Sequence, residues 1–211
     1  MISLKHYHSL VHKCQPITIR ENDLVMGSRI GGNAPEGITP PIINPFTRYF
    51  ATIALDKTGE QELSLFLSID YDENSQADLW RNLKTTHTQD SSLVQFLIHP
   101  RSRRSSSTYL VSELSGHKLE IRDVIDDIPG EPNGALVLFN KIGGRPYFYY
   151  DDPKYIASIN NLFAEGFIYL LQLTCPSAKE APKGRWPFSD YTFHLLAKET
   201  ADGIVWRYGW G

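Results

Sequence analysis

The chain has 211 residues, of which 41% are hydrophobic, 21% are charged and 12% are aromatic, and its formal net charge at pH 7 is −3. This length and composition exclude a disordered chain, and we expect a single compact domain over residues 1–211. The near-balanced charge and the short apolar runs argue against nucleic acid and a membrane as partners, because the first needs a basic surface and the second about 20 apolar residues in a helix.

The amino terminus predicts a short helix over residues 3–13 and has no continuous apolar segment of the kind that a secretory signal needs. We therefore expect a cytoplasmic protein, and two cysteines, Cys14 and Cys175, are too few for a disulfide framework in a chain of this size. His8 and His12 are four residues apart, but neither a neighbouring Glu nor a third ligand indicates a zinc site.

A motif recurs in the two parts of the chain. Residues 25–37, "VMGSRIGGNAPEG", and residues 138–150, "LFNKIGGRPYFYY", share a basic residue, Ile-Gly-Gly and a following Pro. An apolar strand is expected after each copy, at 48–56 and 166–174. The recurrence predicts an internal repeat with halves of approximately 1–125 and 126–211. Neither Gly pair has the spacing of a phosphate-binding loop, so we expect both pairs to serve the backbone.

Further strands are expected at 62–73 and 190–199, where apolar and polar residues alternate. The alternation predicts half-buried strands, with one polar face towards solvent that includes Ser64, Ser68, Thr192, His194 and Lys198.

Additional strands are expected at 92–100, 107–114, 117–124 and 203–211, and helices at 75–84 and 153–166, the latter burying Ile156, Ile159, Leu162 and Phe163. In the last strand, Trp206, Tyr208 and Trp210 share one face and are expected to close the core. The predicted fold is α+β: strand-rich, with two interwoven pseudo-repeated halves, antiparallel sheets and a few short helices.

The acidic segment 70–78, "DYDENSQAD", resembles a calcium loop only in part. Ser75 stands where the turn needs Gly, and Arg81 stands where a bidentate Glu is needed, so we expect a solvated loop and no metal. The basic segment 99–107, "HPRSRRSSS", could bind phosphate or an acidic partner, but as a single patch in a slightly acidic chain it favours a hydrophilic loop. No nucleophile elbow or thiol-enzyme context occurs, so no catalytic residue or cofactor is expected and the chain is predicted not to be an enzyme.

Residues 134–198 carry a family resemblance. "NKIGGRPYFYYDD", "EGFIYLLQLTC" and "GRWPFSDYTFHLLAKE", with a closing "YGWG", resemble the YwqG-like family of bacterial proteins, a domain of unknown function. The resemblance implies an α+β fold of two interwoven, similar halves and brings no established catalytic residues. Small bacterial proteins of this kind are similar to those that accompany secreted antibacterial toxins.

The hypothesis from the sequence is a cytoplasmic immunity protein that neutralises a cognate toxin by direct binding. Acidic loops suit a basic nuclease toxin, because carboxylates mimic phosphate and speed association. The candidate partner-binding residues are Asp70, Asp72, Glu73, Asp126, Asp127, Tyr149, Tyr150, Asp151 and Asp152. The alternative is a small-molecule binding module or uncharacterised enzyme with a pocket between the two halves, lined by Arg145, Tyr147, Trp186 and His194.

Overall fold

The computed structural model describes residues 4–21, 27–38, 46–55, 60–68, 93–104, 112, 114–127, 140–147, 153–174, 182–184, 186–187 and 192–210. Its helices are α1 (Lys5–His8) and α3 (Pro153–Ala164). Its strands are β1 (Lys13–Glu21), β2 (Arg29–Ile30), β3 (Thr47–Ala54), β4 (Gln61–Ser68), β5 (Val94–Pro100), β6 (His117–Ile121), β7 (Ile125–Asp126), β8 (Lys141–Gly143), β9 (Ile168–Leu173), β10 (Phe193–Thr200) and β11 (Gly203–Trp210).

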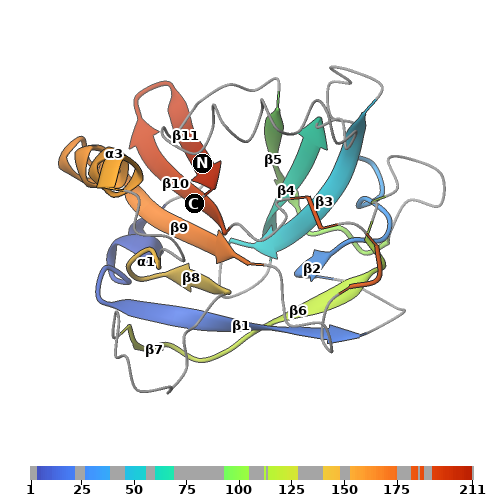
Figure 1. The fold of residues 1–211 in the computed structure, drawn as a ribbon. Helices are drawn as coiled ribbons and strands as arrows, with labels where there is room; N and C mark the ends of the chain where they lie inside the picture. Colours follow the sequence, from blue (N-terminus) through green and yellow to red (C-terminus); the bar gives the residue numbers. More distant parts are fainter. Residues whose placement is uncertain are drawn as a thin grey trace.

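The strands form one curled antiparallel sheet in the order β11-β10-β9-β8-β1-β6-β2-β3-β4-β5, with β7 beside the start of β1. We call β1 and β8–β11 the β1 half, and β6 and β2–β5 the β6 half. The two halves meet at the β1–β6 pair, which crosses the bottom of the view in Figure 1, and each then curls upward. The predicted strand-rich, antiparallel architecture is confirmed.

The curl brings the two end strands, β5 and β11, against each other. Phe96 of β5 stacks on Trp206 of β11 with 5.2 Å between ring centroids, and Tyr208 lies 5.7 Å from the same ring. Trp206 and Tyr208 therefore help to close the core, as predicted. The inside of the curl is filled by one large apolar cluster that includes Leu63, Leu65 and Leu195.

The outer face of the sheet differs from the prediction. Ser64, Thr192 and His194 were expected to face solvent, but each is fully buried, and Ser68 is also buried. In the β1 half, the reason is α3, whose Tyr155 ring lies 5.6 Å from the His194 ring on this face. Period-two alternation was correct, but the polar side of these strands faces a buried hydrogen-bonded layer rather than water.

The helix predicted at 153–166 is present as α3, and Gly166, with φ 89°, follows its last turn. Its buried side chains are Tyr155, Ile159 and Leu162, whereas Phe163, which was expected inside, is 37% exposed. The amino-terminal helix is shorter than predicted, because α1 ends at His8. The helix expected at 75–84 and most of the strand expected at 107–114 lie outside the described residues.

The two sheet halves have matching strand registers. Arg29 pairs with Thr52 as Lys141 pairs with Gln172. The register between β3 and β4 skips Phe50 of β3. The register between β9 and β10 likewise skips Leu170 of β9. Main-chain bonds match as well: Leu119 N donates to Ser28 O at 2.9 Å, and Ile17 N donates to Asn140 O at 2.9 Å.

The Gly pairs occupy matching positions after β2 and at the end of β8. All four residues have positive φ, between 70° and 78°. A Cβ on Gly31 would lie 2.3 Å from the carbonyl oxygen of Ser115, and one on Gly144 would lie 2.2 Å from Asp127 Oδ2. Both pairs therefore serve the backbone, as predicted, because no other residue fits the conformation and the space together.

Candidate functional site

Two of the nine predicted partner-binding residues, Asp126 and Asp127, lie in the described part of the chain. The other seven lie outside the described residues: Asp70, Asp72, Glu73, Tyr149, Tyr150, Asp151 and Asp152. Asp126 is exposed on β7, where it pairs with Lys13 of β1. Its neighbours Val124 and Ile125 are 39% and 42% exposed, and Asp123 is exposed as well. We call these four consecutive residues, Asp123 to Asp126, the β7 surface.

Asp127 points the other way. Lys141 Nζ donates to both of its carboxylate oxygens, at 2.9 and 3.0 Å, and the backbone N–H of Arg145 donates to Oδ2 at 2.5 Å. Both side chains of the ion pair are 4% exposed. The carboxylate of Asp127 is therefore held inside the sheet, contrary to its expected place on a partner-binding surface.

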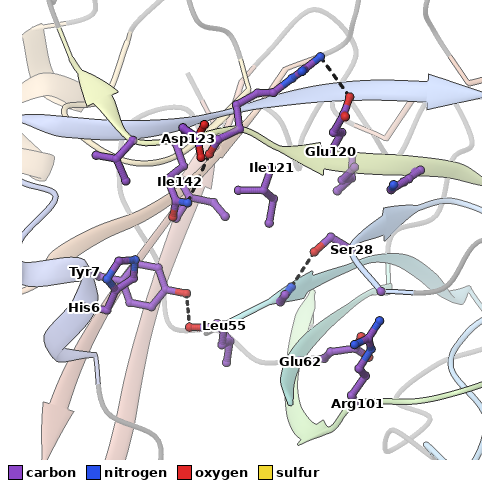
Figure 2. Close-up of a pocket in the computed structure, with 17 residues that line it drawn as sticks. His6, Tyr7, Ser28, Leu55, Glu62, Arg101, Glu120, Ile121, Asp123 and Ile142 are labelled. Atoms are coloured by element: carbon purple, nitrogen blue, oxygen red, sulfur yellow. Dashed lines mark hydrogen bonds and ion pairs between the residues drawn. The ribbon is translucent and has the colours of Figure 1, made fainter. Parts of the chain in front are cut away.

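A pocket of about 620 Å³ lies between the two sheet halves. Gln15 and Ile142 come from the β1 half, and Ser28, Glu62 and Leu119 come from the β6 half. Figure 2 shows α1 beside this pocket. There the hydroxyl of Tyr7 donates to the carbonyl of Leu55 at 2.6 Å. The charged side chains that line the pocket are Glu62, Arg101, Lys118, Glu120, Arg122 and Asp123.

Glu62 is the unusual residue of this pocket. It is fully buried on β4, its Oε2 accepts the backbone N–H of Ser102 at 3.3 Å, and its Oε1 has no hydrogen-bond partner in the described structure. His99 Nδ1 lies 4.0 Å from Oε2. A buried carboxylate oxygen without a partner is costly, so Glu62 marks the pocket wall as a candidate site for a donor group.

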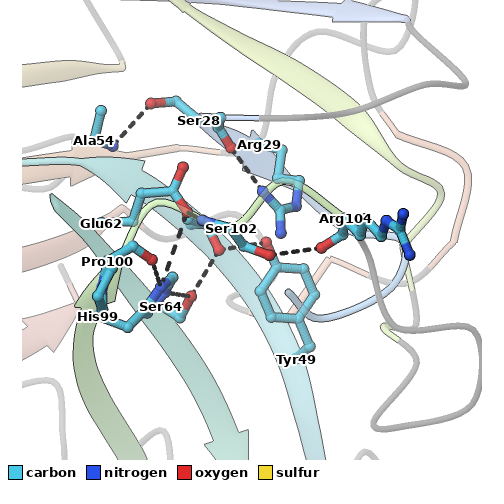
Figure 3. Close-up of polar contacts among 12 residues, drawn as sticks. Ser28, Arg29, Tyr49, Ala54, Glu62, Ser64, His99, Pro100, Ser102 and Arg104 are labelled. Carbon is cyan, nitrogen blue, oxygen red and sulfur yellow. Dashed lines mark hydrogen bonds and ion pairs between the residues drawn. The ribbon is translucent and has the colours of Figure 1, made fainter. Parts of the chain in front are cut away.

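Behind Glu62 lies a buried polar network on the outer face of the β6 half (Figure 3). Arg29 is 1% exposed; its Nη1 donates to Gly27 O at 2.9 Å, and Nε and Nη2 have no hydrogen-bond partner in the described structure. Its guanidinium lies 5.9 Å from the centroid of the Tyr49 ring. Burial raises the pKa of Tyr49 to about 12, so its hydroxyl keeps its proton at neutral pH.

The proton positions in this network follow from the acceptor at its end. His99 Nδ1 lies 2.8 Å from the carbonyl oxygen of Pro100, which can only accept, so Nδ1 carries the proton. Burial lowers the pKa of His99, which favours the neutral ring, and Nε2 then accepts from Ser64 Oγ at 2.8 Å. Ser64 in turn accepts from Thr52 at 2.7 Å, and Thr52 accepts from Tyr49 at 2.8 Å.

Ser64, His99 and Glu62 have the order of groups that activates a serine nucleophile. Two observations argue against that chemistry. Ser64 is fully buried, and the carbonyl of Pro100, rather than Glu62, is the hydrogen-bond partner of His99 Nδ1. The hydrogen bonds of Ser64 and His99 therefore satisfy buried polar atoms and do not prepare a nucleophile. Sequence reasoning missed this network, although Arg29 and Glu62, as charged residues beside apolar strand positions, were the available signal.

The described structure places the residues of the alternative pocket hypothesis in different surroundings. The backbone N–H of Tyr147 and the hydroxyl of Tyr169 both donate to Gln172 Oε1, at 2.8 and 3.0 Å, and Tyr169 also bonds His194. Trp186 instead packs on Phe50 in the core, with ring centroids 5.7 Å apart.

Among the described residues, no group of three or more His, Cys, Asp or Glu side chains could hold a metal ion. No described helix has the length and apolar character to cross a membrane. In the basic segment, Arg101, Arg103 and Arg104 are exposed, while Ser102 is buried and donates to the carbonyl of Arg104.

No protein-family model, curated protein or solved structure matches the chain. The resemblance to the YwqG-like family stays a prediction from the motifs of residues 134–198.

Proposed function

We propose that the protein acts by binding a partner protein rather than by catalysis, and that the β7 surface contributes to the contact. The observation that carries this proposal is the exposure of Val124 and Ile125 between two exposed carboxylates, Asp123 and Asp126. Apolar side chains supply affinity when a partner covers them, and the flanking charges supply specificity and a faster encounter.

The finer proposal is a cytoplasmic immunity protein that neutralises a cognate antibacterial toxin. The acidic β7 surface, together with the acidic segments at 70–78 and 151–152, supports a basic partner such as a nuclease. The family resemblance supports a bacterial setting in which the neighbouring gene encodes the toxin.

The test is a binding assay between this chain and the product of the neighbouring gene, at low and high salt. We expect a complex that weakens as salt rises, because exposed charges are screened. Replacing Asp123 and Asp126 by Lys should weaken it at least about tenfold, since like charges across an interface repel. Asp202→Lys, in the exposed turn between β10 and β11, is the matched control and should leave affinity unchanged. Equal effects of the two variants, or no complex at all, would sink the proposal.

The alternative, a small-molecule binding module, is favoured by one observation: the buried, unpartnered Oε1 of Glu62, a residue of the wall of the pocket between the sheet halves. A thermal-shift screen separates the two functions. Stabilisation by a small molecule, lost in Glu62→Gln, supports the pocket, whereas stabilisation only by a protein supports the partner.

We also propose that the α+β fold consists of two interwoven pseudo-repeated halves. Matching registers support this, and so do matching side-chain bonds: Ala54 N donates to Ser28 Oγ at 2.9 Å, and Thr174 N donates to Asn140 Oδ1 at 2.8 Å. If the positions are equivalent, exchanging the two side chains in a Ser28→Asn, Asn140→Ser double variant should cost no more than about 1 kcal/mol of unfolding free energy. A chain that no longer folds would contradict the equivalence.

A further inference from the structure

A second hollow, of about 680 Å³, shares Tyr7 with the pocket between the sheet halves, and no residue of the β7 surface lines it. It is bounded by α1 and the turn after it, by residues 144–146, and by the carboxyl-terminal end of α3 with the start of β9. Figure 1 shows α1 and α3 on the same side of the molecule, beside β9. We call this hollow the α1–α3 groove.

The walls of the α1–α3 groove are largely apolar and partly open. Val11 and Phe163 line it and are 51% and 37% exposed, so they are two of the most exposed large hydrophobic side chains in the described structure. Leu10, Phe167 and Tyr169 form its buried base. Apolar side chains that converge on a hollow of this size are typical of a site for an apolar ligand.

The charge of the groove has one sign. Its charged or ionisable lining residues among those described are Arg145 and the histidines His8 and His12, together with Tyr7 and Tyr169, and no described carboxylate lines it. Arg145 Nη2 donates to His12 Nδ1 at 3.1 Å, which holds the guanidinium at the groove. An apolar hollow with one permanent cation at its edge complements a molecule with one negative charge.

The position of Arg145 is fixed by the buried interior. Its backbone N–H is bound by Asp127, which is held by Lys141, and the preceding Gly144 leaves no space for a Cβ beside the same carboxylate. The Lys-Ile-Gly-Gly motif thus places the residue that follows it. Because the backbone at Arg145 is already ordered, the entropic cost of binding a ligand there would come mainly from ordering the Arg145 side chain.

We propose that the α1–α3 groove binds a small molecule that has a single carboxylate on an apolar body. The carboxylate lies on Arg145, whose fork of N–H donors matches two carboxylate oxygens, and the apolar body covers Val11 and Phe163. A monoanion fits better than a phosphate dianion, because Arg145 is the one permanently charged side chain among the described lining residues.

The test uses 4-phenylbutyrate, with 4-phenylbutylamine and 4-phenylbutanol as probes of the same shape and different charge. Thermal shift and calorimetry should show stabilisation and binding by the carboxylate and much less by the amine. Arg145→Gln should weaken carboxylate binding about tenfold, and Phe163→Ser should weaken carboxylate and alcohol alike. Arg103→Gln, which removes an exposed arginine that does not line the groove, is the matched control.

Circular dichroism of each variant shows whether it is folded, and Phe163→Ser provides a second variant if Arg145→Gln is not. Equal binding of acid and amine, or equal effects of Arg145→Gln and Arg103→Gln, would overturn the proposal. A concentration-dependent dimer that Phe163→Ser abolishes and 4-phenylbutyrate leaves intact would assign the groove to a second copy of the chain instead. None of these outcomes depends on whether the β7 surface binds a toxin.

Discussion

Asp126 and Asp127 are adjacent in the chain but differ in environment, and this permits a controlled test of the buried ion pair. Asp127→Asn leaves Lys141 charged and without its counter-ion inside the sheet. We expect a loss of about 3–5 kcal/mol in the free energy of unfolding, measured by urea denaturation, because removing one partner leaves an uncompensated buried charge.

Asp126→Asn makes the same chemical change one residue earlier, at an exposed position, and should cost less than about 0.5 kcal/mol. If both variants lose the same stability, the ion pair does not have the structural role assigned to it here.

Cys14 gives a prediction of pH dependence. Burial raises the pKa of its thiol to about 12, with a further contribution from the negative charge of Asp127. The pKa of a cysteine in an unfolded chain is about 8.5–9. The thiol therefore contributes stability fully below about pH 9, and this contribution is lost as the pH rises towards 12, because the unfolded chain releases the proton first. Urea midpoints at pH 7 and pH 10.5 should differ less in Cys14→Ala than in the parent protein; an equal difference would contradict the assignment.

At the scale of elements, α3 shows that a helical sequence pattern predicts the extent of a helix better than its buried face. Its extent followed from Pro near the start, Gly at the end and apolar spacing, but its inward face was misplaced by part of a turn, since Tyr155 is buried and Phe163 is not. Tyrosine at a helical position gives no indication of which way it faces, because its ring is apolar and its hydroxyl is polar.

The packing of α3 predicts unequal effects of two truncations on the same helix. Ile159→Ala removes a side chain that is 1% exposed and should cost about 2–4 kcal/mol of unfolding free energy. Phe163→Ala, although the larger truncation, should cost less than Ile159→Ala, because Phe163 is already 37% exposed. Chemical denaturation of both variants checks this, and a reversed order would restore the face expected from the sequence.

The strands were predictable in position but only half predictable in environment. Alternation located β4 and β10 and identified the apolar face, yet serine and histidine on the other face read as solvent-exposed. Ser64 bonds Thr52 and His99 in a buried layer, which one sequence cannot distinguish from a wet surface, since both tolerate polar side chains. For the same reason, the sequence did not predict that Glu62 and Arg29 are buried.

At the scale of the whole molecule, the contact between β5 and β11 was not predictable, because it depends on the accumulated curl of all the intervening strands. The pocket between the sheet halves has the same origin, since its lining comes from segments that are distant in the sequence. The strand-rich antiparallel fold class was predictable, because it depends on local sequence patterns.

The stacked pair Phe96 and Trp206 offers a test of this closure. In a double-mutant cycle with Phe96→Leu and Trp206→Leu, the coupling energy should be about 0.5–1.5 kcal/mol, because each ring loses the same partner. A cycle between Phe96→Leu and Ile159→Ala should be additive within about 0.5 kcal/mol, because Ile159 is not part of the apolar cluster against which Phe96 packs. Additivity in both cycles would mean that the end strands do not support each other.

The position of β1 between β8 and β6 also determines when the sheet can be completed during synthesis. β1 leaves the ribosome well before β8, yet Pro16 pairs with Lys141 and Cys14 pairs with Gly143 in that later strand. At about 5–20 residues per second, β1 waits on the order of ten seconds for that neighbour. Its other neighbour β6, at His117–Ile121, is made only shortly before β8, so β1 lacks any neighbouring strand for most of this wait.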